Sequence, residues 1–192
     1  MNTQTVTPDN STTTTQKAGN YTIDASHSHV GFSVRHLMVS NVRGAFHGFK
    51  GTVAYDPARP EATKLDVSIE VSTIDTREPK RDDHLRSADF FDAEKFPSIT
   101  FVSKSAKARS GGIDVVGDLS IRGTKREVTL VVEDIAADRA DPWGNLRTGA
   151  TAKTKIKRSD FGVTWNAALE AGGVVVGDDI TITIEAELIR DK

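Results

Sequence analysis

The sequence contains no cysteine, which excludes disulfide bonds, cysteine-based zinc sites and thiol catalysis anywhere in its 192 residues. It also lacks a basic excess, because 25 Lys and Arg residues against 27 Asp and Glu residues leave a formal charge of −2. Binding to a phosphate backbone requires excess positive charge, so no nucleic-acid partner is expected. The 37% hydrophobic and 27% charged residues are typical of one globular domain.

Long hydrophobic segments are missing as well. No run approaches the ~20 apolar residues that a membrane-spanning helix needs. The N-terminus has neither the basic nor the apolar region of a secretory signal. The sequence therefore predicts no integral membrane insertion and, by default, a cytoplasmic location. A processed, secreted form stays open, because a protein without cysteine reveals nothing about its redox compartment.

Residues 1–19 are rich in Thr and Asn and contain almost nothing apolar. Such a segment buries too little surface to offset the entropy of its chain. We therefore predict a disordered tail over residues 1–19, followed by a folded domain over residues 20–192.

From Tyr21 onward, apolar and polar residues alternate with a period of two, which is typical of strands with one buried face. Eight runs follow this pattern, at residues 30–36, 42–55, 65–71, 99–104, 113–122, 128–135, 146–156 and 180–188. The second run changes phase near Gly48, which predicts a bulge there. Short connections favour antiparallel neighbours, and eight such strands close most economically into a barrel. A two-sheet sandwich is the alternative.

One long connection, between Ile74 and Ser98, has the features of a helix. Asp75 or Thr76 is suited to cap it, Pro79 fits its first turn, and Leu85 and Ala88 share a face. The predicted fold is thus all-β, an extended eight-stranded antiparallel barrel with one flanking helix in the connection after the third strand.

The predicted interior mixes large and small side chains. Alongside Val, Ile and Phe, the small inward residues are Gly44, Gly117, Thr148, Ala150, Ala152 and Ala186. An eight-stranded barrel is either filled by its own side chains or holds one small ligand. The small residues favour a long, narrow, apolar cavity for an extended hydrocarbon chain, stabilised by ~25 cal/mol per Å² of apolar surface buried. A barrel filled by the neighbouring large side chains is the alternative.

Three longer segments carry further information. They are YTIDASHSHVGFSVRHLMVSNVRGAF (21–46), IDTREPKRDDHLRSADFFDAEKFPSITF (74–101), and the pair LSIRGTKREV (119–128) and RSDFGVTWNAALEAGG (158–173). Together they resemble the YceI-like family of lipocalin-like, polyisoprenoid-binding proteins, over roughly residues 20–190. The resemblance implies a lipocalin-like barrel flanked by a helix, a tunnel for an isoprenoid-type lipid, homodimers and no catalytic centre. Many members of that family have a secretion signal, and the sequence shows none.

The resemblance places the family's apolar tunnel at the inward strand positions. These are Val30, Phe32, Val34, Phe46, Leu65, Val67, Ile69, Phe101, Leu119, Ala150, Ala152 and Ile182. A pyrophosphate or quinone head group requires cationic or hydrogen-bonding side chains near the opening. The candidates for this role are His36, Arg81, Asp82, His84 and Trp165. The alternatives are a solvated helical face for Arg81 and Asp82 and a packing role for Trp165.

His27 and His29 form an H-x-H pair, a spacing seen in metal-binding barrels, and His36, His47 and His84 are further possible ligands. His29 alternates with the inward residues and so points outward, which argues against a metal site. A metal-dependent, cupin-like enzyme built on this cluster is the alternative function.

Other catalytic patterns are missing. The sequence has no G-x-S-x-G elbow and no cofactor motif, and its acidic strand residues alternate with the apolar set on the solvated face. We therefore expect no enzyme and no cofactor. The predicted function is to bind, carry or sequester a polyisoprenoid or related amphiphilic lipid, of the polyprenyl phosphate or isoprenoid quinone type. A filled barrel with a structural or interaction role is the remaining alternative.

Overall fold

The computed structural model describes residues 16–168 and 172–192. In these residues one antiparallel sheet has the strands β1 (Gly19–Ile23), β2 (His29–His36), β3 (Ser40–Phe46), β4 (Phe49–Tyr55), β5 (Lys64–Glu70), β6 (Ile74–Asp75), β7 (Ser98–Arg109), β8 (Gly112–Ile121), β9 (Thr124–Glu133), β10 (Arg139–Ala140), β11 (Leu146–Lys157) and β12 (Val176–Arg190). The helices are α1 (Pro79–Arg86) and the short 3-10 helices η1 (Ala25–His27), η2 (Pro60–Ala62), η3 (Val71–Thr73) and η4 (Arg158–Phe161).

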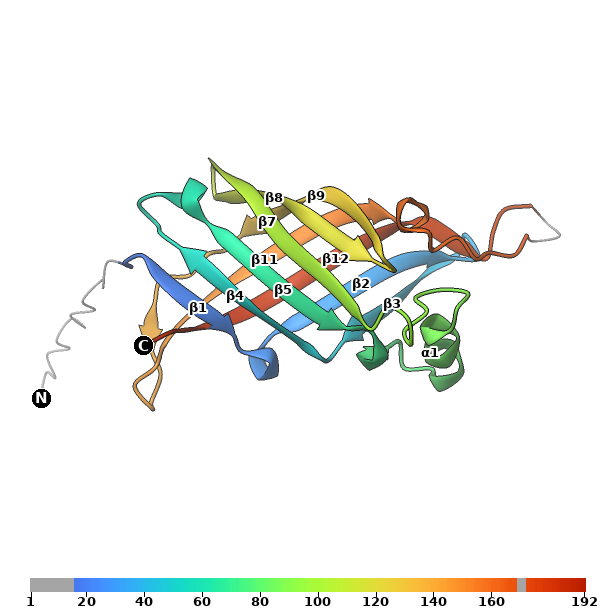
Figure 1. The fold of residues 1–192 in the computed structure, drawn as a ribbon, viewed down its shortest axis with the longest axis horizontal. Helices are drawn as coiled ribbons and strands as arrows, with labels where there is room; N and C mark the ends of the chain where they lie inside the picture. The colour runs from blue at the N-terminus through green and yellow to red at the C-terminus, as the bar shows by residue number, and fades with distance from the viewer. Residues whose placement is uncertain (1–15, 169–171) are drawn as a thin grey trace, which may run out of the picture.

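Eight strands close the barrel, in the order β11-β9-β8-β7-β5-β4-β1-β12, because β12 also pairs with β11. The long strand β12 crosses the barrel obliquely (Figure 1). Strands β1 and β2 pair in succession with the same edge of β12, at Ile23↔Leu188 and His29↔Glu185. They therefore act as one strand interrupted by η1. The predicted eight-stranded antiparallel barrel is confirmed.

The phase change near Gly48 has a different cause from the predicted bulge. Strand β3 ends at Phe46 and pairs with β2, whereas β4 begins at Phe49 and pairs with β1 and β5. Between them, the Gly48 amide leaves the ladder and donates to Thr73 Oγ1 at 2.9 Å. The prediction of a bulge was wrong, because the chain breaks into two strands that meet different partners.

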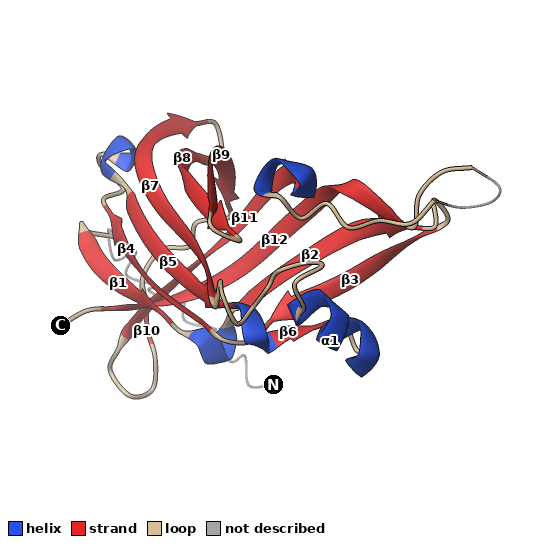
Figure 2. Cartoon of the chain, turned by 45° about the vertical axis from the view of Figure 1, so that its right-hand side comes forward, coloured by secondary structure: helices blue, strands red, loops and turns tan. Residues whose placement is uncertain are grey.

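The predicted helix is α1, which lies beside β3 and β6 at one end of the barrel (Figure 2). Its cap is Glu78, whose carboxylate accepts from the Lys80 amide, and not Asp75 or Thr76. Asp75 accepts instead from the amide of Arg77, which has a positive φ of 64°. Ala88 lies beyond the helix end. In the described part of the chain, no helix is long and apolar enough to cross a bilayer.

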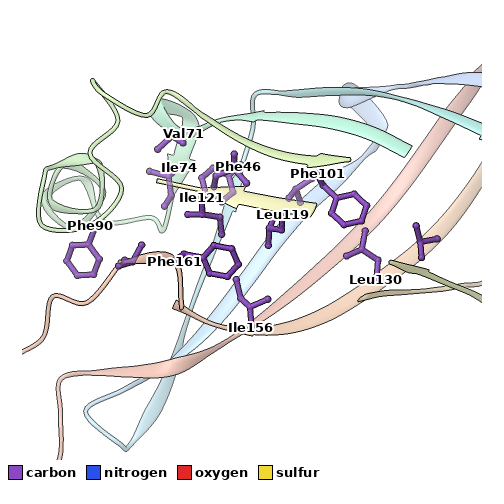
Figure 3. Close-up of a cluster of buried hydrophobic side chains, with 14 of the residues drawn as sticks. Phe46, Val71, Ile74, Phe90, Phe101, Leu119, Ile121, Leu130, Ile156 and Phe161 are labelled. Atoms are coloured by element: carbon purple, nitrogen blue, oxygen red, sulfur yellow. The ribbon is translucent and has the colours of Figure 1, made fainter. Parts of the chain in front are cut away.

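Buried apolar side chains concentrate at the α1 end of the barrel. Phe90 lies beside the helix, and Phe161 packs near Ile121 and Ile156 (Figure 3). Phe101 and Leu130 extend the cluster along the barrel interior (Figure 3). This core packs α1 against the barrel. Most of the predicted tail, residues 1–15, lies outside the described residues, and Gly19 already belongs to β1.

Candidate functional site: an apolar cavity inside the barrel

An internal cavity of about 260 Å³ lies in the barrel, and its walls are almost entirely apolar. All eight barrel strands contribute to these walls, together with β2, β3 and α1. On β12 the lining runs from Val176 to Leu188. At ~3.3 Å per residue, this stretch measures about 40 Å along the tilted strand. The cavity is therefore long and narrow, a shape suited to an extended chain.

The structure places all twelve residues predicted for the tunnel in the wall of this cavity. They are Val30, Phe32, Val34, Phe46, Leu65, Val67, Ile69, Phe101, Leu119, Ala150, Ala152 and Ile182. Their inward orientation follows from the period-two geometry of the strands, because one face of each strand must be buried. Contact of these side chains with a lipid stays a prediction.

Small side chains form one seam of the wall, where β11 pairs with β12. Ala150 lies directly opposite Ala186 in the β11–β12 register, and Ala152 lies opposite Ile184. Two facing methyl groups project only a short distance inward, so they leave room that larger side chains would fill. Thr148, whose hydroxyl donates to the Ala136 carbonyl at 2.6 Å, continues the seam.

The two inward glycines do not create space, and the expectation that they would was wrong. A Cβ on Gly44 would lie 2.5 Å from Phe32 Cζ, and a Cβ on Gly117 would lie 2.5 Å from Phe101 Cζ. A phenyl ring therefore covers each glycine. These glycines accommodate the two rings and leave no space of their own.

Arg81 and Asp82, two of the predicted head-group residues, hold α1 in place. Asp82 is 7% exposed and accepts from the Thr76 amide at 2.9 Å and the Thr76 hydroxyl at 2.5 Å. Arg81 Nε donates to the same hydroxyl at 2.7 Å, and its Nη2 donates to the Thr76 carbonyl at 2.8 Å. Neither side chain lines the cavity. A head-group role for them stays a prediction, and the contacts show that they connect α1 to the segment after β6.

His84 and Trp165 lie one layer behind the cavity wall. Their rings meet edge to face with centroids 4.9 Å apart, and both contact Phe90, which lines the cavity. His84 Nε2 also lies 2.9 Å from Asp89 Oδ2. His36, the fifth candidate, ends β2 opposite Val176 and is not part of the wall either. Head-group contact stays a prediction for all three.

Arg158 is a wall residue that the sequence reasoning missed. It is 8% exposed, lines the cavity at the α1 end and donates to four main-chain carbonyls. Nε reaches Gly177 at 2.9 Å, Nη1 reaches Val163 at 2.7 Å and Trp165 at 2.9 Å, and Nη2 reaches Val176 at 3.3 Å. Burial lowers the pKa of this guanidinium from its ordinary value, because an apolar environment disfavours the charged form.

A signal for Arg158 was present in the sequence. Thr154 and Ile156 lie on the inward face of β11, and one further step of two residues reaches Arg158. The alternation therefore predicts an inward side chain here, although the residue is charged. The pattern alone did not show that carbonyls would satisfy it.

A second polar group lies at the opposite end of the barrel. Tyr21 is fully buried and lines the cavity, and its hydroxyl donates to Asp138 at 3.1 Å. Arg190 pairs with the same carboxylate at 2.7 Å. Burial raises the pKa of the Tyr21 hydroxyl above its ordinary value. The cavity thus ends in a buried layer whose charges neutralise one another.

The histidines do not form the cluster that a cupin-like site requires. His27 lies in η1 and His29 begins β2, so the pair does not share the face of one strand. Among the described residues, one group has the proximity for a metal ion, namely Asp24, His27 and Glu187. Arg147 Nη1 occupies this group, at 2.7 Å from Asp24 and 2.5 Å from Glu187. The guanidinium already neutralises the carboxylates that a cation would need.

Comparison with known proteins agrees with this geometry. The YceI-like domain family matches residues 21–188. The protein YceI of Salmonella newport (strain SL254) is 39% identical over 155 residues, which cover 80% of this chain and 81% of that protein. The similarity therefore includes most of the barrel.

Solved structures show the same fold. The Burkholderia cenocepacia protein BcnA has a TM-score of 0.75 at 26% identity, covering 86% of this chain and 98% of that chain. The Campylobacter jejuni YceI protein has a TM-score of 0.67 at 34% identity, covering 82% and 90%. A polyisoprenoid binding domain from Saccharophagus degradans has a TM-score of 0.64 at 16% identity, covering 89% and 98%, and supports the fold alone. By sequence and by structure, the chain belongs to the YceI-like domain family.

Proposed function

We propose that this protein binds one polyisoprenoid or related amphiphilic lipid inside the barrel and catalyses no reaction. The observation that carries the proposal is the apolar cavity of about 260 Å³. Apolar walls offer a ligand few hydrogen bonds, so they select for hydrocarbon and against polar metabolites. The narrow shape selects further for an extended tail over a compact ring system.

The titratable groups of the wall support a binding role. They are Tyr21, Tyr55 and Arg158. Burial raises the pKa of both tyrosines, so their hydroxyls stay protonated at neutral pH. General acid–base catalysis favours a group whose pKa lies near the working pH, and the raised pKa of the two tyrosines moves them away from that condition. A ligand in the cavity is thus held by apolar contact and shielded from water.

The relatives support the ligand class. One structure with the same fold is named a polyisoprenoid binding domain, and the sequence motifs resemble a family with that property. A polyprenyl phosphate or an isoprenoid quinone combines the required tail with a compact polar head. Carriage between membranes and sequestration both follow from this binding mode. We extend the proposal to a homodimer, which light scattering of the purified protein tests.

Native mass spectrometry of the purified protein, followed by organic extraction, tests the proposal. We expect a mass excess of one lipid per chain that disappears on denaturation and is identified in the extract. The same protein, stripped and incubated with polyprenyl phosphate, polyprenol and an isoprenoid quinone, should regain one ligand. A bare polypeptide mass under all these conditions would contradict lipid binding and favour a filled or structural barrel.

A further inference from the structure

The β2–β3 hairpin ends in a turn of exposed apolar side chains. Leu37, Met38 and Val39 are 41%, 56% and 77% exposed, and Val174 of the neighbouring segment is 38% exposed. The two segments are joined by a hydrogen bond of 2.8 Å from the Leu37 amide to the Val175 carbonyl. Leu37, Met38, Val39 and Val174 together form the apolar tip. Exposed apolar residues that gather in one place mark an interaction surface, whereas scattered ones do not.

The apolar tip projects at one end of the barrel. β3 pairs with β2 along its whole length, but among the described residues its other edge pairs only with the two-residue strand β6. The outer half of the hairpin therefore extends past α1 (Figure 2). β2 stays paired with β12 as far as His36↔Val176. The tip is thus held on an arm made of β2, β3 and the start of β12.

Folding alone does not account for the residues in this turn. The Val39 amide donates to the His36 carbonyl at 3.0 Å, and Leu37 and Met38 between them have positive φ values of 50° and 59°. Two positive φ values define a type I′ hairpin turn, which favours Asn-Gly over bulky side chains. Leu-Met is unfavourable here for the backbone and for contact with water. Residues that oppose the local fold in this way indicate a role outside it.

The hairpin is also positively charged. Residues 29–46 include Arg35, Arg43 and two histidines, and they include no acid. Arg35 alternates with the cavity residue Val34, and the β2–β3 register places Arg43 diagonally across from it on the same outer face. Arg35 Nη2 donates to the Met38 carbonyl at 2.9 Å, which holds this cation directly beside the tip.

Two acids at the start of β12 bind other groups. Asp178 accepts from the Ser159 hydroxyl at 2.8 Å, and Asp179 pairs with Lys155 at 2.7 Å. The hairpin therefore presents apolar side chains at its end and guanidinium groups behind them. This order matches the interface of an anionic bilayer, in which apolar side chains enter the acyl boundary and cations contact the lipid phosphates.

We propose that the apolar tip docks the protein on the surface of an anionic lipid bilayer. The inference rests on the proposed function and names the partner that supplies and receives the bound lipid. Val34 and Val176 line the cavity and lie just behind the tip on β2 and β12. Docking brings this end of the cavity against the bilayer, so the lipid tail passes between two apolar environments with little exposure to water.

Cosedimentation of the stripped full-length protein with lipid vesicles tests the proposal. Wild type should bind vesicles of phosphatidylglycerol and phosphatidylcholine in equal parts, and bind phosphatidylcholine vesicles more weakly. The double variant Leu37→Asn with Met38→Gly should bind the mixed vesicles roughly 10- to 100-fold more weakly, because each partly exposed apolar side chain contributes about one order of magnitude. The variant should melt at or above the wild-type temperature, because Asn-Gly suits this turn. Its loss of binding is then separate from any loss of fold.

Trp143→Ala is the matched control. Trp143 is 80% exposed in the connection between β10 and β11, at the other end of β12, where Arg147 pairs with Ile189. This variant should bind vesicles as wild type does. Loss of binding in Trp143→Ala but not in the double variant would move the docking surface to that end and overturn the proposal.

Two outcomes in wild type separate this inference from the proposed function. A protein that takes up lipid from solution but binds no vesicles would overturn the docking surface alone, and a dimer that only the double variant fails to form would then assign the tip to a second copy. A protein that binds vesicles through the tip but takes up no lipid would support docking and contradict the proposed function.

Discussion

Replacing Ala150 with phenylalanine would place an aromatic ring in the wall of the cavity. Ala150 faces Ala186 across the β11–β12 pair, so the ring meets a methyl group and open space. A cavity of about 150 Å³ is enough to hold a benzene molecule. A phenyl ring would therefore occupy a substantial part of the 260 Å³ that this cavity offers.

The expected loss of affinity follows from the contact area that the ring displaces. A buried phenyl ring covers about 150 Å² or more. At ~25 cal/mol per Å², losing that area costs the lipid about 4 kcal/mol, nearly three orders of magnitude in Kd. The fold should survive, because the ring fills an apolar void, and overpacking typically costs about 1–3 kcal/mol.

The assay measures lipid uptake by native mass spectrometry and the free energy of unfolding in urea. Ala150→Phe should bind little or no lipid and unfold cooperatively. The control is Lys153→Phe, which places the same ring on the exposed outer face of the same strand. It should bind lipid as wild type does. Equal uptake by both variants would refute an internal binding site.

Three further predictions follow from the packing and the charges. Gly117→Ala would bring a Cβ to 2.6 Å from the Val102 carbonyl oxygen and should destabilise the fold by about 1–3 kcal/mol, and a wild-type urea midpoint would contradict this close approach. Hydrogen bonds from Arg147 hold the pKa of Asp141 well below its ordinary range, so this contribution to stability is present at neutral pH and is lost as the solution is acidified. Arg147→Met should therefore have a lower melting temperature than wild type at pH 7. Below about pH 5 the melting temperature of the variant should fall less steeply than that of wild type. The same pH dependence in both proteins would argue against the ion pair. Equimolar zinc should leave the melting temperature unchanged in wild type and in His27→Ala. If wild type instead bound one zinc ion per chain and His27→Ala bound none, the metal-dependent alternative would be favoured.

The inward residues were predictable because strand alternation is a local property. Leu65, Val67 and Ile69 are two residues apart, so one face of their strand had to be apolar wherever that strand lay. The same rule extended by one step predicts the inward position of Arg158. The helix position was predictable from Pro79, but its cap was not, because Asp75 and Thr76 found other partners in the folded chain.

The head-group candidates show the limit of motif reasoning. Arg81, Asp82 and His84 lie in a segment that the resemblance pointed to, and their charges suited a polar head. In the fold, Arg81 and Asp82 form hydrogen bonds with Thr76, and His84 packs behind Phe90. Residue type shows which interactions are available, whereas the partner is decided by segments that the sequence does not place.

The alternation in the sequence predicted the inward faces and favoured a closed antiparallel barrel, because both depend on a period of two and on short connections, but it merged β3 and β4 into one run. Where the barrel is open depends on contacts that form only in the folded chain. Gly44 lies opposite Phe32, whereas Ala150 lies opposite Ala186. A small residue leaves no space where a ring from its cross-strand neighbour lies over it. That pairing is a matter of register between distant segments, and no local pattern specifies it.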